Sequence, residues 1–359
     1  MRSLILFSGA ALGLLACTSE EPPTGPSGSP NLARATTGAY TAQRLGTLAG
    51  PGFDGWSSNA YAINPSGQVV GSSEPPSGVG LHAFLWKKGV MSDLGTLGGS
   101  SSGAYDLNPA GQVVGWSNTA EGRTSHAFLW EKGVMTDLGT LGGNSSEARA
   151  INPSGQVVGA SQTASDTGNH AFLWEKGVMT DLGTLGGCCS EAYDINPSGQ
   201  VVGSSWMAGN ATYHAFLWEK GVMTDLGTLG GIWSYARGLN PSGQVVGASG
   251  TARGSYHAAL WEKGVWTDLG GPDPPPYTGL YEVSFALAIN PAGQIVGSSN
   301  FGDYGPSFPV IWENGVISEV LPSGDGCCAE AVDINPAGQV VGAFNVDYGV
   351  QEATLYTRK

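Results

Sequence analysis

The phrase Asn-Pro-Ser-Gly-Gln-Val-Val-Gly, or a close variant of it, recurs along the chain and limits the possible fold more than any other feature. Its copies begin at Asn64, Asn108, Asn152, Asn196, Asn240, Asn290 and Asn335. The intervals between them are 44 residues four times, then 50 and 45. A period of this length is typical of proteins in which every repeat is one supersecondary unit. The chain must therefore place seven copies of one small unit side by side.

Each repeat contains four short runs of strand-forming residues, separated by turn signals. In the third repeat these runs are residues 146–151, 156–161, 170–174 and 178–185. Of the 359 residues, 58 are glycine and 21 are proline, which favours short strands and many turns over helices. Four strands in about 44 residues match one blade of a β-propeller. A β-solenoid is the rival architecture, because it also uses short periodic strands.

The two ends of the repeated region favour the propeller. The last repeat stops after its third run, Glu352 to Tyr356, and the missing fourth run has its counterpart near the N-terminus, from Ala42. This offset lets the N-terminal strand complete the last blade, whereas an open solenoid would carry polar caps at both ends. We therefore predict an all-β, seven-bladed propeller of four-stranded antiparallel blades, closed by its N-terminal strand.

The first residues have the pattern of a secretion signal. Arg2 is followed by an apolar run from Leu4 to Leu15, which is too short to span a membrane as a helix. The ending Leu-Leu-Ala-Cys resembles a bacterial lipobox, in which Cys17 is lipidated and becomes the mature N-terminus. The alternative is a plain signal with an incidental cysteine. We expect a signal peptide in residues 1–16, a flexible tether rich in Pro, Ser and Gly in residues 17–40, and the propeller in residues 41–359.

The charge balance restricts the partners. The chain has 15 basic and 29 acidic residues, and a surface of that sign repels nucleic acid and anionic lipid headgroups. We therefore expect no nucleic-acid partner and contact with the membrane only through the lipid. The predicted location is the bacterial cell envelope, at the outer membrane or cell surface, and the predicted state is a monomer.

All five histidines of the chain occupy one position of the repeat, at the start of the third run: His82, His126, His170, His214 and His257. In a propeller, equivalent residues of neighbouring blades lie too far apart to share one metal ion. We interpret these histidines as structural, each bonded to the Ser of a first strand or to the Asp of the fourth run. That aspartate is Asp93, Asp137, Asp181, Asp225 or Asp268. We predict no metal site and no cofactor.

The histidine motif also carries a family resemblance. It reads His82-Ala83-Phe84, His126-Ala127-Phe128, His170-Ala171-Phe172 and His214-Ala215-Phe216, then weakens to His257-Ala258-Ala259, Phe308-Pro309-Val310 and Glu352-Ala353-Thr354. The motif and its period resemble the HAF repeat family of bacterial extracellular proteins, over roughly Arg44 to Tyr356. The resemblance implies a secreted or surface repeat protein and supplies no reaction.

Three acids in innermost strands keep an enzymatic alternative open. Asp106, Asp194 and Asp333 stand two residues before the repeated Asn in the second, fourth and seventh repeats, so no adjacent pair of carboxylates arises. A glycosidase of the usual kind needs two carboxylates close together. A single catalytic carboxylate near the channel is still compatible with the sequence.

The remaining cysteines form two adjacent pairs, Cys188-Cys189 and Cys327-Cys328, in the loops that enter two first strands. A secreted chain folds under oxidising conditions, so we expect disulfides. The fourth and seventh blades are too far apart for bonds between the two loops, because Cα atoms beyond about 7 Å cannot be bridged. The preferred hypothesis is therefore a disulfide within each pair. Bonds between the two loops are the second possibility, and a metal site of four thiolates is the third.

The loops differ between repeats at only one face of the propeller. The turns between first and second and between third and fourth strands hardly change, whereas the other loops differ in every repeat. Recognition is commonly concentrated on the loops at one end of a scaffold. The candidate ligand-binding residues are Trp56, Tyr61, Tyr105, Arg149, Tyr193, Trp206, Trp233 and Arg237. They suit an extracellular glycan or protein, so we predict a binding module. A polysaccharide-cleaving propeller using Asp106 or Asp194 and a purely structural surface protein are the alternatives.

Overall fold

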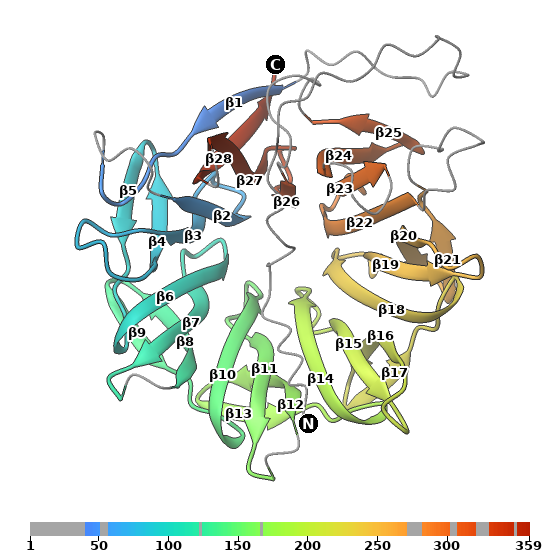
Figure 1. The fold of residues 1–359 in the computed structure, drawn as a ribbon. Coiled ribbons are helices and arrows are strands. Elements are labelled where there is room, and N and C mark those ends of the chain that lie inside the picture. The colour runs from blue at the N-terminus through green and yellow to red at the C-terminus, as the bar shows by residue number, and fades with distance from the viewer. Residues whose placement is uncertain are drawn as a thin grey trace.

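A computed structural model describes residues 40–50, 57–121, 124–165, 168–270, 282–301, 307–320, 330–347 and 350–359. These residues form 28 strands, which gather in small sheets around a common centre (Figure 1). None of them belongs to a helix that is long and apolar enough to cross a membrane.

Each of the four kinds of strand that the repeat predicts occurs seven times among the described residues. The first strands are β2 (Ser58–Ile63), β6 (Gly98–Leu107), β10 (Gly142–Ile151), β14 (Gly186–Ile195), β18 (Gly230–Leu239), β22 (Glu282–Ile289) and β26 (Glu330–Ile334). The second are β3 (Val69–Ser73), β7 (Val113–Thr119), β11 (Val157–Thr163), β15 (Val201–Met207), β19 (Val245–Thr251), β23 (Ile295–Phe301) and β27 (Val340–Asp347). The third are β4 (His82–Lys87), β8 (Ser125–Glu131), β12 (Asn169–Glu175), β16 (Tyr213–Glu219), β20 (Tyr256–Glu262), β24 (Ser307–Glu313) and β28 (Val350–Arg358). The fourth are β5 (Val90–Asp93), β9 (Val134–Asp137), β13 (Val178–Asp181), β17 (Val222–Asp225), β21 (Val265–Asp268), β25 (Val316–Glu319) and β1 (Tyr40–Arg44).

The strands of a repeat pair in chain order as an antiparallel sheet, for example β10-β11-β12-β13. The fifth and sixth repeats are joined into one larger sheet by a single parallel bridge between Tyr256 and Val283. At the end of the chain the order is β1-β28-β27-β26, with Tyr40 opposite Arg358. The N-terminal strand therefore supplies the fourth strand of the last sheet, as the offset of the repeats predicts.

Tyr40 corrects the predicted boundary between tether and propeller. Composition alone assigned residue 40 to the tether, but it begins β1 and is 8% exposed. Its side chain packs with Val340 and Tyr356 in a core cluster of the last sheet. The strand extends one residue further because this aromatic ring is held by the core.

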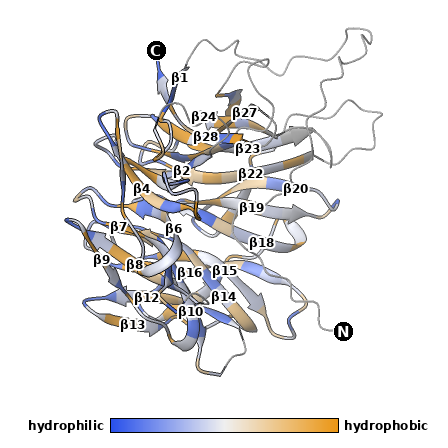
Figure 2. Ribbon diagram, turned by 60° about the vertical axis from the view of Figure 1, so that its left-hand side comes forward, coloured by the Kyte–Doolittle hydropathy of each residue, from blue (hydrophilic) through white to orange (hydrophobic). Residues whose placement is uncertain are grey.

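The core lies between neighbouring sheets. Val157 and Val158 are adjacent in β11, so their side chains point to opposite faces of the sheet. Val157 packs with Phe172 in one cluster, and Val158 packs with Phe216 of the next repeat in another. Both valines are fully buried. Each sheet thus contributes to two cores, and hydrophobic segments follow the strands (Figure 2).

The repeated Asn joins one repeat to the next. Asn152 Oδ1 accepts backbone hydrogen bonds from Ser154 and Gln156, which fixes the turn. Its Nδ2 donates to the carbonyl oxygen of Asn196, one repeat further, at 3.3 Å. Asn335 of the last repeat makes the same bond to Asn64 of the first, at 3.2 Å. First strands also contact each other from repeat to repeat, and β26 contacts β2. This all-β arrangement of four-stranded antiparallel sheets is consistent with a β-propeller.

Candidate functional site

The candidate residues of the first strands share one backbone irregularity. In β10, Ala148 is opposite Gly159 and Ala150 is opposite Val158, so Arg149 is the extra residue of a β-bulge. The same register shift recurs in all seven first strands, and a bulge redirects the side chain of its extra residue. The bulged residues are Tyr61, Tyr105, Arg149, Tyr193, Arg237, Leu287 and Val332.

The glycine of the second strand makes this bulge possible. A Cβ on Gly159 would lie 2.0 Å from the carbonyl oxygen of Glu147. Equivalent glycines meet the same obstacle, at 1.8 to 2.0 Å, in every repeat. The glycine that ends the repeated phrase is therefore required, because the backbones of the first and second strands approach each other too closely there for a side chain.

Five successive bulged residues contact each other across the repeats. The rings of Tyr61 and Tyr105 are 5.5 Å apart, centroid to centroid. The Arg149 guanidinium lies 4.7 Å from the Tyr105 ring and 5.9 Å from the Tyr193 ring. On the other side of Tyr193, the Arg237 guanidinium lies 4.2 Å from the same ring. Cation–π contacts of this kind are attractive, most of all where water is excluded.

Two glutamates support this row from the same strands. Glu147 forms an ion pair with Arg149, and the Tyr193 hydroxyl donates to Glu191 at 2.7 Å. Burial is the main cause that raises the pKa of Tyr105 and of Tyr193 to about 12. Burial also raises the pKa of Glu147, against the opposing effect of Arg149.

A second group of rings begins where this row ends. We call Trp206, Tyr213, Trp233, Tyr235, Tyr256 and Phe285 the aromatic cluster. Trp233 is its centre: its ring is 4.2 Å from Tyr256, 5.8 Å from Tyr213 and 6.1 Å from Tyr235, always stacked. Tyr213 also contacts Trp206 at 5.6 Å.

Tyr235 connects the cluster to the row of bulged residues. Its ring stacks on Phe285 of the next repeat and lies 5.5 Å from the Arg237 guanidinium. The structure thus brings seven sequence-predicted residues into one run of contacts: Tyr61, Tyr105, Arg149, Tyr193, Arg237, Trp233 and Trp206. The eighth, Trp56, lies outside the described residues.

Sequence reasoning missed four members of the aromatic cluster. Tyr213 and Tyr256 each precede the repeated His, and Tyr235 and Phe285 stand five residues before the repeated Asn. Aligning the repeats by position would have shown aromatic residues gathering in the fourth to sixth repeats. The distance between these positions along the chain concealed their contact in space.

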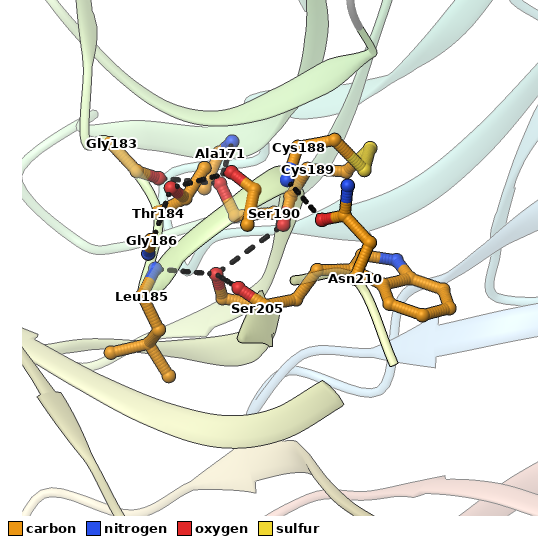
Figure 3. Close-up of a disulfide and its surroundings, with 12 residues drawn as sticks. Ala171, Gly183, Thr184, Leu185, Gly186, Cys188, Cys189, Ser190, Ser205 and Asn210 are labelled. Carbon is orange, nitrogen blue, oxygen red and sulfur yellow. Dashed lines mark hydrogen bonds between the residues drawn. A yellow bond between two sulfur atoms is a disulfide. The ribbon is translucent and has the colours of Figure 1, made fainter. Parts of the chain in front are cut away.

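Cys188 and Cys189 form a disulfide between adjacent residues, which is the pairing expected for this loop (Figure 3). The Cys188 N–H donates to Asn210 Oδ1 at 2.8 Å, so the disulfide is tied to the loop between β15 and β16. A site of four thiolates is thereby excluded for this pair. Cys327 and Cys328 lie outside the described residues, as does Cys17.

The three inner aspartates join neighbouring repeats through backbone hydrogen bonds. Asp106 accepts from Leu107 of its own strand at 2.7 Å and from Ile151 of the next repeat at 2.8 Å. Asp194 and Asp333 make the same pair of bonds, and Asp333 reaches Ile63 of the first repeat. Burial, the largest cause in each, raises the pKa of Asp106, Asp194 and Asp333 to about 8, 7 and 6. Both oxygens of each carboxylate are thus engaged by the backbone.

The histidines bond to the aspartates of their own sheets. His170 Nδ1 is 2.8 Å from Asp181 Oδ2, and Asp181 Oδ1 accepts the N–H of Gly183 at 2.7 Å. All five histidines have this partner. Of the two local partners that the sequence suggested, the structure shows the aspartate. Within the described ranges, no group of three or more His, Cys, Asp or Glu side chains is placed to hold a metal ion.

Comparison with known proteins finds likeness only among solved structures. No protein-family model and no curated protein matches the chain. TolB from Acinetobacter baumannii is 14% identical with a TM-score of 0.48, over 70% of this chain and 63% of the TolB chain. The acylaminoacyl peptidase of Pyrococcus horikoshii is 9% identical with a TM-score of 0.51, over 84% of this chain and 53% of the peptidase chain. The Aleuria aurantia lectin is 9% identical with a TM-score of 0.38, over 84% of this chain and 94% of the lectin.

The similarity is one of fold alone. This chain spans less than two thirds of the TolB and peptidase chains. The peptidase alignment indicates a similar course of the backbone over most of this chain.

Proposed function

We propose that this chain is a closed, seven-bladed propeller that binds an extracellular glycan through its variable face. The bond from Asn335 to Asn64 and the bond from Ile63 to Asp333 support the closed ring, because both join the last repeat to the first. We further propose that the protein is a monomer of the HAF repeat type. Lipidated Cys17 would hold it to the cell envelope as its only membrane contact, and a Cys17→Ser chain should then leave the membrane fraction.

The aromatic cluster carries the binding proposal. Trp and Tyr rings offer flat apolar faces beside polar edges, and such rings are common where a protein holds an amphipathic ligand. Tyr256 is 37% exposed, and Trp206, Tyr213 and Trp233 are half-buried. The rings are therefore within reach of a ligand from solvent.

The other repeats indicate that the fold does not need these rings. The position of Trp233 is occupied by serine in the first three repeats, at Ser57, Ser101 and Ser145. The position of Tyr213 and Tyr256 is occupied by Ser125 in the second repeat and Asn169 in the third. Those repeats build the same four-stranded sheets. Aromatic residues at these positions are thus better explained by a ligand than by packing.

A glycan array probed with the full chain in detergent tests this proposal. Trp233→Ser introduces the residue that three other repeats carry, so it should keep the melting temperature. It should weaken binding of any glycan found at least tenfold, because a buried aromatic contact contributes about 1.5 to 3 kcal/mol. Ser145→Ala, the matched control in the third repeat, should leave binding unchanged.

Two results would contradict the glycan proposal. One is a glycan that binds Trp233→Ser as tightly as the unaltered chain. The other is an array without binding combined with a protein ligand that requires Trp233, which would make the partner a protein.

A further inference from the structure

Two arginines at the same bulged position have different surroundings. Arg149 is ion-paired with Glu147, which stands two residues earlier on the same strand. In the fifth repeat, the equivalent of Glu147 is Tyr235. Arg237 therefore has an aromatic ring where Arg149 has a carboxylate.

Two aromatic rings contact the Arg237 guanidinium, but no carboxylate of the described residues pairs with it. It lies between the rings of Tyr193, at 4.2 Å, and Tyr235, at 5.5 Å. Among the residues that the structure describes, it forms no ion pair and no hydrogen bond; its buried Nε lacks an acceptor, as does Nε of Arg149, but Arg149 has the carboxylate of Glu147 at Nη2. Glu147 and Glu330 influence Arg237 only through longer-range electrostatics. Buried polar atoms such as the Nε of Arg237 ordinarily have a hydrogen-bond partner, and the chain has 29 acidic residues for 15 basic ones, so carboxylates are plentiful.

Arg237 adjoins the aromatic cluster. Tyr235 touches both the guanidinium and the ring of Trp233, 6.1 Å away. Arg237 itself is partly exposed. A ligand stacked on the cluster would therefore have an unpaired guanidinium beside it.

We infer that the glycan bound at this site carries a carboxylate, as a hexuronic acid does, and that Arg237 binds this group. The inference rests on the glycan-binding function proposed above. A guanidinium matches a carboxylate through two parallel hydrogen bonds, a geometry that lysine cannot provide. Because the net charge of the chain, −14, repels polyanions, we commit to a single acidic sugar at the site rather than a highly charged polymer.

Calorimetry with matched disaccharides tests the inference on the full chain. Three pairs differ only in the terminal unit: glucuronic acid or glucose, galacturonic acid or galactose, and mannuronic acid or mannose. We expect the acidic member of at least one pair to bind at least tenfold more tightly than its neutral partner. Arg237→Gln should reduce this preference to within twofold, whereas Arg237→Lys should keep part of it.

Arg253→Gln is the control for charge. Arg253 is an exposed arginine in the loop between β19 and β20, so its replacement removes the same charge and should keep the preference. Equal binding within all three pairs, or a preference that survives in Arg237→Gln, would overturn the inference. If neutral sugars bind in a Trp233-dependent way without any acid preference, the proposed function stands and this inference is wrong. If no sugar of either kind binds, both are wrong.

Discussion

At the scale of the residue, two neighbouring positions of the first strand both contact the adjacent repeats, but they favour different side chains. The bulged residue projects toward its counterparts in adjacent repeats, and Tyr105 and Arg149 make favourable contact there. The residue after the bulge is in some repeats an aspartate that accepts a backbone N–H of the next repeat. Where Asp106 reaches into the third repeat, the equivalent residue there is Ala150, and Gly238 stands in the same relation to Asp194. Because Ala150 and Gly238 are small and uncharged, they leave room for the aspartate of the preceding repeat and place no second carboxylate beside it.

The raised pKa values of the inner aspartates predict a stability that falls as the pH rises. Asp106 has a pKa near 8 in the folded protein, against 3.8 ordinarily. Between these values the unfolded chain has released the proton and the folded chain has not, so ionisation favours unfolding increasingly up to about pH 8. Urea denaturation of the unaltered chain at pH 5, 6.5 and 8 should show this decline, and Asp106→Asn should make it smaller, because Asp194 and Asp333 still contribute. A decline of the same size in Asp106→Asn would show that this carboxylate is not its cause.

At the scale of the element, a serine in six of the seven first strands hydrogen-bonds the preceding repeat. Ser190 accepts the Ala171 N–H at 2.9 Å and donates to the Gly183 carbonyl at 2.6 Å (Figure 3). The same serine position serves five other junctions, including Ser58 with Ala353 across the chain ends. Between the sixth and seventh repeats the sequence has Pro309, which has no N–H, and Ala329, which has no hydroxyl. At this junction the sequence thus lacks both the N–H donor and the serine that accepts it elsewhere.

Ser190→Ala should therefore lower the free energy of unfolding. Ser190 is 2% exposed, and its loss leaves the buried Ala171 N–H without an acceptor, which costs about 1 to 3 kcal/mol. Ser154→Ala alters an exposed turn and should cost less than about 0.5 kcal/mol. Denaturant titration measures both, and equal effects of the two changes would refute the role of the serine.

At the scale of the whole molecule, a strand of five residues joins the two ends of the chain. β1 pairs with β28 along its full length, and Leu45 packs with Val69 and Leu355 in the core between the last and first sheets. These contacts belong to no local segment. They can therefore form only when the two ends of the chain have come together.

Deletion of β1 should destabilise the protein far more than deletion of the sequence before it. A chain that lacks residues 2–44 loses the outer strand of the last sheet, and β28 then has an unpaired edge. We expect a lower melting temperature and a greater tendency to aggregate than for a chain that lacks only residues 2–38. Identical melting temperatures in a calorimetric scan would contradict the proposal that β1 closes the ring.

The sequence by itself determined the repeat, the four strands of each unit and the place of β1, because strand and turn preferences act over a few residues and recur seven times. It also favoured a disulfide between Cys188 and Cys189 over the other possibilities, and the structure shows that bond. Only the tertiary structure decided that Trp206, Tyr213, Trp233 and Tyr256 share one surface, and that Arg237 has lost the partner of Arg149. The ring contacts join different strands of the fourth and fifth repeats, so they depend on how strands and sheets pack, and the surroundings of Arg237 depend on where a bulge turns its side chain.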